Sequence, residues 1–103
     1  MDNNSKIMNL LGLAKRAGKV SMGQDLVLRE ISKSSKNLLV FIASDAGENI
    51  RKKINDKTKY YELTLINTFD TDDLSKALGS VNRKTVVIND KGFIKKIKEL
   101  YNS

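Results

Sequence analysis

The chain has 103 residues, which suits one domain with a single hydrophobic core and is too short for two. It contains no cysteine and no histidine, so thiol nucleophiles, imidazole bases, disulfides and zinc sites built from these residues are excluded. Its 19 Lys and Arg residues against 12 Asp and Glu residues give a net charge of +7, which favours a polyanionic partner, nucleic acid before an acidic membrane surface. A charge that serves only solubility is the alternative.

The start of the chain and its hydropathy do not predict export or membrane insertion. Residues 1–4 lack a basic segment followed by an apolar run, and no stretch approaches the ~20 apolar residues that a membrane span needs. We therefore expect residues 1–103 to form one domain of a cytoplasmic protein with no membrane partner. We also expect a monomer.

Two helices are predicted before the first long apolar run. The first is capped by Asn4 or Ser5, ends at Gly18 and carries apolar residues at helical spacing. Lys19–Ser21 leaves room for only a short strand, and Gly23 opens the second helix.

The second helix is predicted to end in the polar cluster 32–37, and a buried strand follows it. Leu38–Ala43 is apolar without alternation, which is typical of a strand covered on both faces. Asp45 and Glu48 have the spacing of a capping box, so a tight turn should lead into a third helix. Residues 61–66 predict the next strand.

The last third of the chain repeats this alternation. Asp70 is predicted to start a short fourth helix that Gly79 ends. Thr85–Ile88 predicts a further buried strand, after which Asn89 or Asp90 caps the last helix. Helices alternating with short buried strands indicate an α/β protein: a single-domain three-layer α/β/α sandwich with a small central mixed sheet of about four strands.

Ligands of α/β sheets gather where strand ends lead through loops into helices. Three such loops are predicted here, over residues 18–25, 44–48 and 79–84. The first is the most informative, because the start of a helix exposes unpaired N–H groups that attract phosphate. Lys15, Arg16, Lys19 and Arg29 are close to it in the sequence. If the loops lie on one edge, they form a surface for a phosphate backbone rather than a catalytic pocket.

An enzyme would have to use aspartates as its acids, because stronger candidates are lacking. These aspartates stand where helix caps are expected, which favours a structural role. Gly18-x-x-x-x-Gly23 lacks the Lys-Ser/Thr pair of a phosphate-binding P-loop. We therefore predict no catalytic residues, no metal and no cofactor. Aromatic residues are too scarce for a base-stacking platform, so structured RNA is a better match than single strands.

Five segments, in order along the chain, resemble one family. They are LGLAKRAGK over 11–19, Gly23-x-x-x-x-x-Arg29-x-Ile31, VFIASDA over 40–46, ALG over 77–79 and VVI over 86–88. They are similar to the L-seven-Ae family of ribosomal proteins, whose members bind kink-turn RNA, and within it to the short bacterial YlxQ type. The resemblance implies an α/β/α sandwich that binds structured RNA without a cofactor. The RNA would be a kink-turn or similar internal loop, ribosomal or ribosome-associated, with the ribosome or translation-related proteins as further partners.

In this family the second helix begins with glycine, any residue, asparagine, glutamate, two more residues and lysine, and enters the RNA groove beside tandem sheared G·A pairs. Gly23 matches the glycine, Asp25 stands at the asparagine and Arg29 at the lysine. Leu26 stands at the glutamate and can neither donate nor accept a hydrogen bond. The predicted RNA-binding residues of the three loops and their surroundings are Lys15, Arg16, Lys19, Gly23, Gln24, Asp25, Arg29, Asp45, Ala46, Gly47, Val81, Asn82, Arg83 and Lys84.

A second hypothesis belongs to another class of function. Leu26 at the glutamate position also fits a protein-docking module in which the fold is kept and the RNA-reading residues have drifted. An exposed Leu26 would support this alternative, and a buried one would remove its main motivation.

Overall fold

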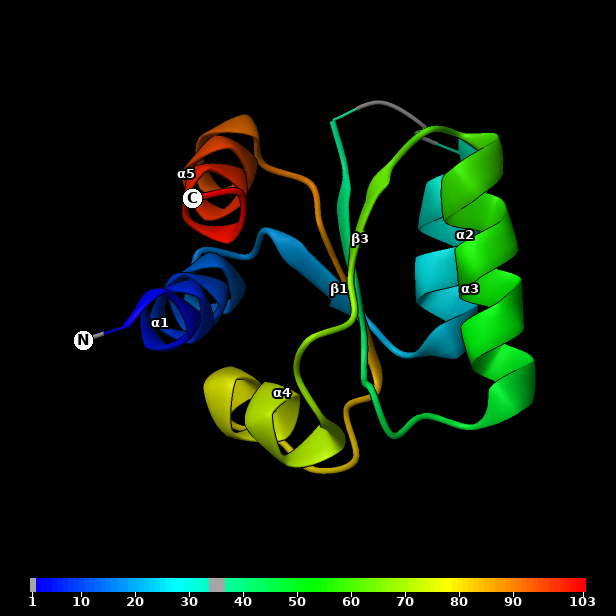
Figure 1. The fold of residues 1–103 in the computed structure, drawn as a ribbon, viewed down its shortest axis with the longest axis horizontal. Helices are drawn as coiled ribbons and strands as arrows, with labels where there is room; N and C mark the ends of the chain where they lie inside the picture. Colours follow the sequence, from blue (N-terminus) through cyan, green and yellow to red (C-terminus); the bar gives the residue numbers. More distant parts are fainter. Residues whose placement is uncertain (1, 34–36) are drawn as a thin grey trace.

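The computed structural model describes residues 2–33 and 37–103, in which five helices cover both faces of one four-stranded sheet. The elements are α1 (Asn3–Arg16), β1 (Val20–Met22), α2 (Gln24–Lys33), β2 (Leu39–Ile42), α3 (Glu48–Tyr60), β3 (Thr64–Ile66), α4 (Thr71–Leu78), β4 (Thr85–Ile88) and α5 (Lys91–Tyr101). Helices α1, α4 and α5 lie on one face of the sheet, and α2 and α3 lie on the other (Figure 1). The predicted three-layer sandwich is confirmed.

The strands form a mixed sheet in the order β1-β4-β2-β3. β4 is antiparallel to both of its neighbours, and β2 is parallel to β3. Every residue of β2 and β4 is buried, because helices cover these central strands on both faces. Both strands were expected from their unbroken apolar runs, and both are confirmed.

Helix ends follow the capping rules at most positions. Asp70 and Asp90 accept hydrogen bonds from the backbone N–H groups of Asp73 and Phe93, as expected for N-caps, and Gly79 ends α4 with φ 62°. The N-cap of α1, however, is Asp2 rather than Asn4 or Ser5. Its carboxylate accepts from the Ser5 N–H at 2.7 Å, so the helix begins two to three residues earlier than predicted.

The strand predicted over residues 61–66 is half as long as expected. Tyr61 ends α3, and Glu62 takes φ 56°. The Leu63 N–H then donates to the Thr58 carbonyl at 2.8 Å, which completes the last turn of the helix and keeps these residues out of the sheet. β3 therefore begins only at Thr64. Helix α2 ends at Lys33, and residues 34–36 of the predicted polar cluster lie outside the described residues.

None of the helices in the described parts of the chain is long and apolar enough to cross a membrane.

Helices α1 and α4 approach each other closely at Gly12. A Cβ atom at this position would lie 2.8 Å from the carbonyl oxygen of Ala77, inside van der Waals contact. The Ala77 carbonyl belongs to the backbone of a packed helix, so it cannot turn aside for a Cβ atom as a flexible side chain can. Only glycine therefore fits between the two helices without a shift.

We expect Gly12→Ala to destabilise the fold although alanine is the better helix former. Overpacking of this kind costs about 1–3 kcal/mol, whereas the gain in helix propensity is about 1 kcal/mol. Urea unfolding of both proteins would measure the difference. Gly47→Ala is the matched control, because a Cβ at Gly47 meets nothing within 4 Å. A Gly12→Ala variant more stable than the parent protein would contradict the close approach.

Candidate nucleic-acid interface

The sheet register brings three chain segments to one edge, the lower end of the sheet in Figure 1. We call it the loop edge: residues 23–25 after β1, 44–47 after β2 and 81–84 before β4. The Gly23 N–H donates to the Thr85 carbonyl at 3.1 Å, and the Ala43 N–H donates to the Lys84 carbonyl at 2.8 Å. These two hydrogen bonds fix all three segments side by side.

The start of α2 forms the first part of the loop edge. Gly23 takes φ 97°, a conformation that favours glycine, and its carbonyl accepts the Val27 N–H, so the helix starts directly after the strand. Gln24 and Asp25 are exposed in the first turn. Arg29 is also exposed and lies one turn after Asp25 on the same side of the helix. The positive end of the helix dipole and this cation therefore face solvent together.

The turn after β2 is held by Asp45, in a way that the sequence did not predict. Its Oδ1 atom accepts from the Thr71 N–H at 2.9 Å and from the Thr71 hydroxyl at 2.7 Å. The capping box predicted for Asp45 and Glu48 is wrong, because the N-cap of α3 is Gly47, which has no side-chain hydrogen bond. Asp45 ties the turn to the start of α4 instead. Ala46 is buried and anchors the turn, while Gly47 is exposed.

The Asp45 contacts also set its acidity. The side-chain and backbone hydrogen bonds from Thr71, with a smaller contribution from the positive charge of Lys84, hold the pKa of the Asp45 carboxyl below its ordinary value of 3.8. A lowered pKa stabilises the fold above the pKa of the unfolded chain, and this contribution is lost as the pH falls through the folded-state pKa.

We therefore expect Asp45→Asn to have a lower Tm than the parent protein at neutral pH. The gap should shrink as the pH falls below about 3.8, because the parent then also loses the charge. Thermal melts across this range would check it, with Thr71→Val, which removes one of the two donors, as the companion variant. A gap that stays constant with pH would show that the charge of Asp45 does not stabilise the fold.

The loop before β4 is held by two serines. The Ser75 hydroxyl, buried on α4, accepts the Arg83 N–H at 3.0 Å, and the Arg83 Nε–H donates to the Ser80 hydroxyl at 2.9 Å. Asn82 at the tip takes φ 53°. The loop thus has a defined shape that presents Val81, which is 77% exposed, to solvent. Lys84 is exposed beside it.

The remaining predicted cations do not lie at the start of α2. Lys19 stands at the opposite end of β1, where its carbonyl accepts the Asn89 N–H at 3.1 Å. It is separated from Gly23 by the whole strand, although the sequence predicts both on one basic turn. Lys15 and Arg16 line a hollow between α1 and α4 that also reaches Gly79.

Sequence reasoning missed several residues that shape or border the loop edge. Thr71 and Ser75 have no local signal, because their partners lie far along the chain or in another loop. Arg51, Lys52 and Asn67 surround a hollow of about 530 Å³ next to the turn after β2. Over residues 2–33 and 37–103 no cluster of Asp and Glu could hold a metal ion.

Sequence comparisons find relatives that match over most of the chain. The "RNA-binding protein YlxQ" of Enterococcus faecium is 44% identical over 98 residues, which cover 95% of this chain and 93% of the relative. The protein of the same name from Bacillus subtilis (strain 168) is 39% identical over 88 residues, covering 85% and 87%.

Solved structures share the fold. A protein of unknown function from Bacillus halodurans C superposes with a TM-score of 0.88 at 31% identity, covering 95% of this chain and 98% of the other. The Giardia lamblia 15.5kD RNA binding protein superposes with a TM-score of 0.80 at 16% identity, covering 99% of this chain and 88% of the other. At this low identity the similarity shows only a shared fold. Residues 5–98 match the profile of one family, and the chain thus belongs to the ribosomal protein L7Ae/L30e/S12e/Gadd45 family.

Proposed function

We propose that this protein binds structured RNA at the loop edge. The observation that carries the proposal is that Gly23 at the start of α2 is hydrogen-bonded to Thr85 at the start of β4, so the exposed start of α2 lies beside the loop before β4. Relatives at 44% and 39% identity are named RNA-binding proteins, which supports the same ligand class. The proposed contact residues at this edge are Gly23, Gln24, Asp25, Gly47, Val81, Asn82, Arg83 and Lys84, and Arg29 joins them from the next turn of α2. Asp45 and Ala46 hold the turn after β2.

We propose a kink-turn or similar internal loop as the RNA element, in ribosomal or ribosome-associated RNA. Gly23 matches the glycine of the family motif and Arg29 keeps the positive charge of its lysine, which supports this choice. Leu26 has no hydrogen-bonding group for a base edge, so contacts to the RNA backbone supply most of the affinity. The protein acts as a cytoplasmic monomer, without a cofactor and without catalysing a reaction.

The proposal predicts that cations at or near the loop edge contribute to binding, whereas a cation at the opposite end of the sheet does not. Arg29→Ala and Lys84→Ala should each weaken binding to a kink-turn RNA and lower the salt slope of the affinity by about 1. Lys19→Ala is the matched control, because it removes the same charge at the opposite end of β1. Filter binding at several salt concentrations would measure all of them. Equal losses in the three variants would mean that only net charge matters and would overturn the proposed site.

Specificity for the RNA element is tested with a second ligand. A duplex in which Watson–Crick pairs replace the G·A pairs of the kink-turn should bind more weakly to the parent protein. If both RNAs bind equally, the kink-turn part of the proposal fails while structured RNA remains the ligand.

A protein-docking module is the second candidate, and one observation favours it. Leu26 is 51% exposed on the first turn of α2, at the same edge as the exposed Val81. Exposed apolar side chains at an interaction edge are typical of protein interfaces. If neither RNA binds the parent protein, this second candidate replaces the first.

A further inference from the structure

A hollow of about 610 Å³ lies between α1 and α4. We call it the α1–α4 groove. Its lining includes three cations, Lys15, Arg16 and Lys76, and one acid, Asp73. The Asp73 carboxylate already accepts the Asp70 N–H at 3.3 Å as part of the capping box of α4. The groove is therefore positively charged, and its acidic side chain already serves to cap α4.

The cations gather there because of the close helix approach at Gly12. Lys15 and Arg16 follow Gly12 by about one helical turn, and Lys76 directly precedes Ala77, whose carbonyl faces Gly12. With no side chain at Gly12, the two helices meet and their long basic side chains flank the crossing. Arg16 and Lys76 are exposed, and Lys15 is half-buried.

The α1–α4 groove is adjacent to the loop edge. Gly79 lines the groove, and Val81 belongs to the loop edge. Two residues of chain span at most about 7 Å, so a polymer bound at the loop edge has its next units within reach of the groove. The groove is positively charged and lies beside an edge that binds a polyanion. We therefore expect it to bind the same polyanion and not a separate ligand.

We propose that the α1–α4 groove binds the phosphate backbone of a stem that flanks the RNA element held at the loop edge. This inference rests on the proposed function and extends it: the protein contacts two regions of one RNA. Lys15, Arg16 and Lys76 contact phosphates there, and these contacts favour RNAs in which a stem continues beyond the internal loop.

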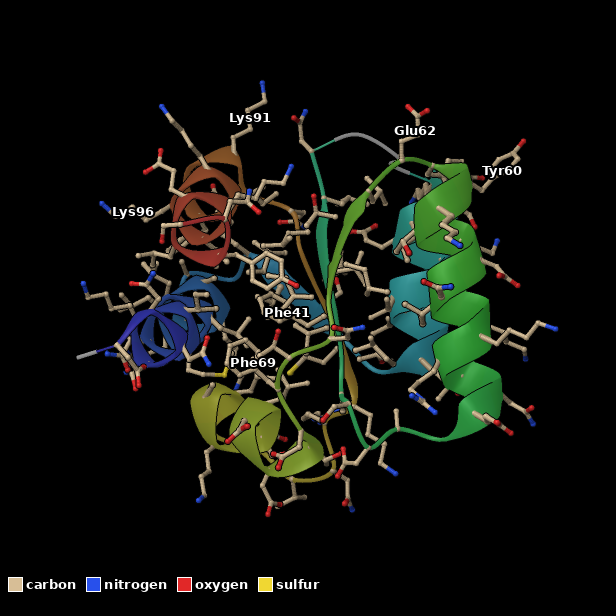
Figure 2. The ribbon with its side chains drawn as sticks, in the orientation of Figure 1. Phe41, Tyr60, Glu62, Phe69, Lys91 and Lys96 are labelled. Atoms are coloured by element: carbon tan, nitrogen blue, oxygen red, sulfur yellow. The ribbon has the colours of Figure 1, made fainter. Side chains whose placement is uncertain are left out.

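The test compares two RNAs and two triple variants. One RNA has a long flanking stem, and the other is cut back close to the internal loop. The variant K15A/R16A/K76A removes the groove cations, and alanine retains the helices. The control K91A/K95A/K96A removes the same charge from α5, where Lys91 and Lys96 point away from the body of the protein (Figure 2). α1 packs between α5 and α4, so the control site is separated from the groove.

We expect the groove variant to bind the long RNA at least about tenfold more weakly than the parent protein at 0.15 M salt. It should bind the short RNA as the parent does, and the control should change neither affinity by more than about twofold. Equal behaviour of the groove variant and the control would overturn the groove while leaving the loop edge intact. A parent protein that binds neither RNA would overturn the proposed function and the groove with it. Binding of a polyglutamate peptide that is lost in the groove variant, with RNA affinity unchanged, would assign the groove to acidic protein segments and overturn the proposal.

Discussion

Phe41→Ala is expected to lower the free energy of unfolding by about 3–5 kcal/mol. Phe41 lies in the central strand β2 and has no exposed surface. Its ring lies 6.4 Å from that of Phe69 in the layer between the sheet and α1, α4 and α5 (Figure 2). Removing it leaves a cavity that rigid strands on both sides cannot fill. Urea or thermal unfolding would measure the loss.

Tyr60→Ala is the control for this variant. Tyr60 is also aromatic but is 79% exposed at the end of α3, where its ring meets that of Tyr61 edge-on at 4.9 Å. The loss of that contact should cost about 0.5–1.5 kcal/mol. If the two variants were destabilised equally, burial of Phe41 would not be what stabilises the sheet.

Gly23→Ala is expected to weaken RNA binding by about tenfold or more. A side chain at φ 97° is strained by about 1–3 kcal/mol, and the chain can relieve that strain only by shifting the start of α2. About 1.4 kcal/mol corresponds to a tenfold change in affinity. A Cβ at Gly23 meets nothing within 4 Å, so the effect comes from backbone conformation and not from a clash.

Gly18→Ala separates strain from binding. Gly18 also has a positive φ, 73°, and open space around it, but it lies beyond the other end of β1. Both variants should melt at lower temperatures, and only Gly23→Ala should bind RNA more weakly. An equal loss of affinity in both would trace the effect to stability instead of to the loop edge.

The fold could be predicted because local rules and the tertiary structure agree at most positions. The short unbroken apolar runs of β2 and β4 are typical of strands covered on both faces. Asp70, Asp90 and Gly79 follow capping rules that depend on neighbours within a few residues. The order of the strands and the direction of β4 could not be predicted from the sequence, because they depend on contacts between distant segments.

The candidate site was predicted less well, for two physical reasons. The position of Lys19 depends on β1, which is short but extended and so places Lys19 and Gly23 at opposite ends of the sheet. The role of Asp45 depends on Thr71, 26 residues further along the chain. Only folding brings these two residues together, so the local spacing of Asp45 and Glu48 could not predict the contact. Local spacing therefore predicted where the loops are but not the hydrogen bonds that hold them in place.

The two outermost strands of the sheet, β1 and β3, have three residues each. Each spans about 10 Å and offers too few free N–H and C=O groups to recruit a strand from another molecule. The apolar strands that could template aggregation, β2 and β4, are enclosed between them. The order of the strands thus keeps the fully apolar centre of the sheet away from strands of other molecules and limits aggregation through it.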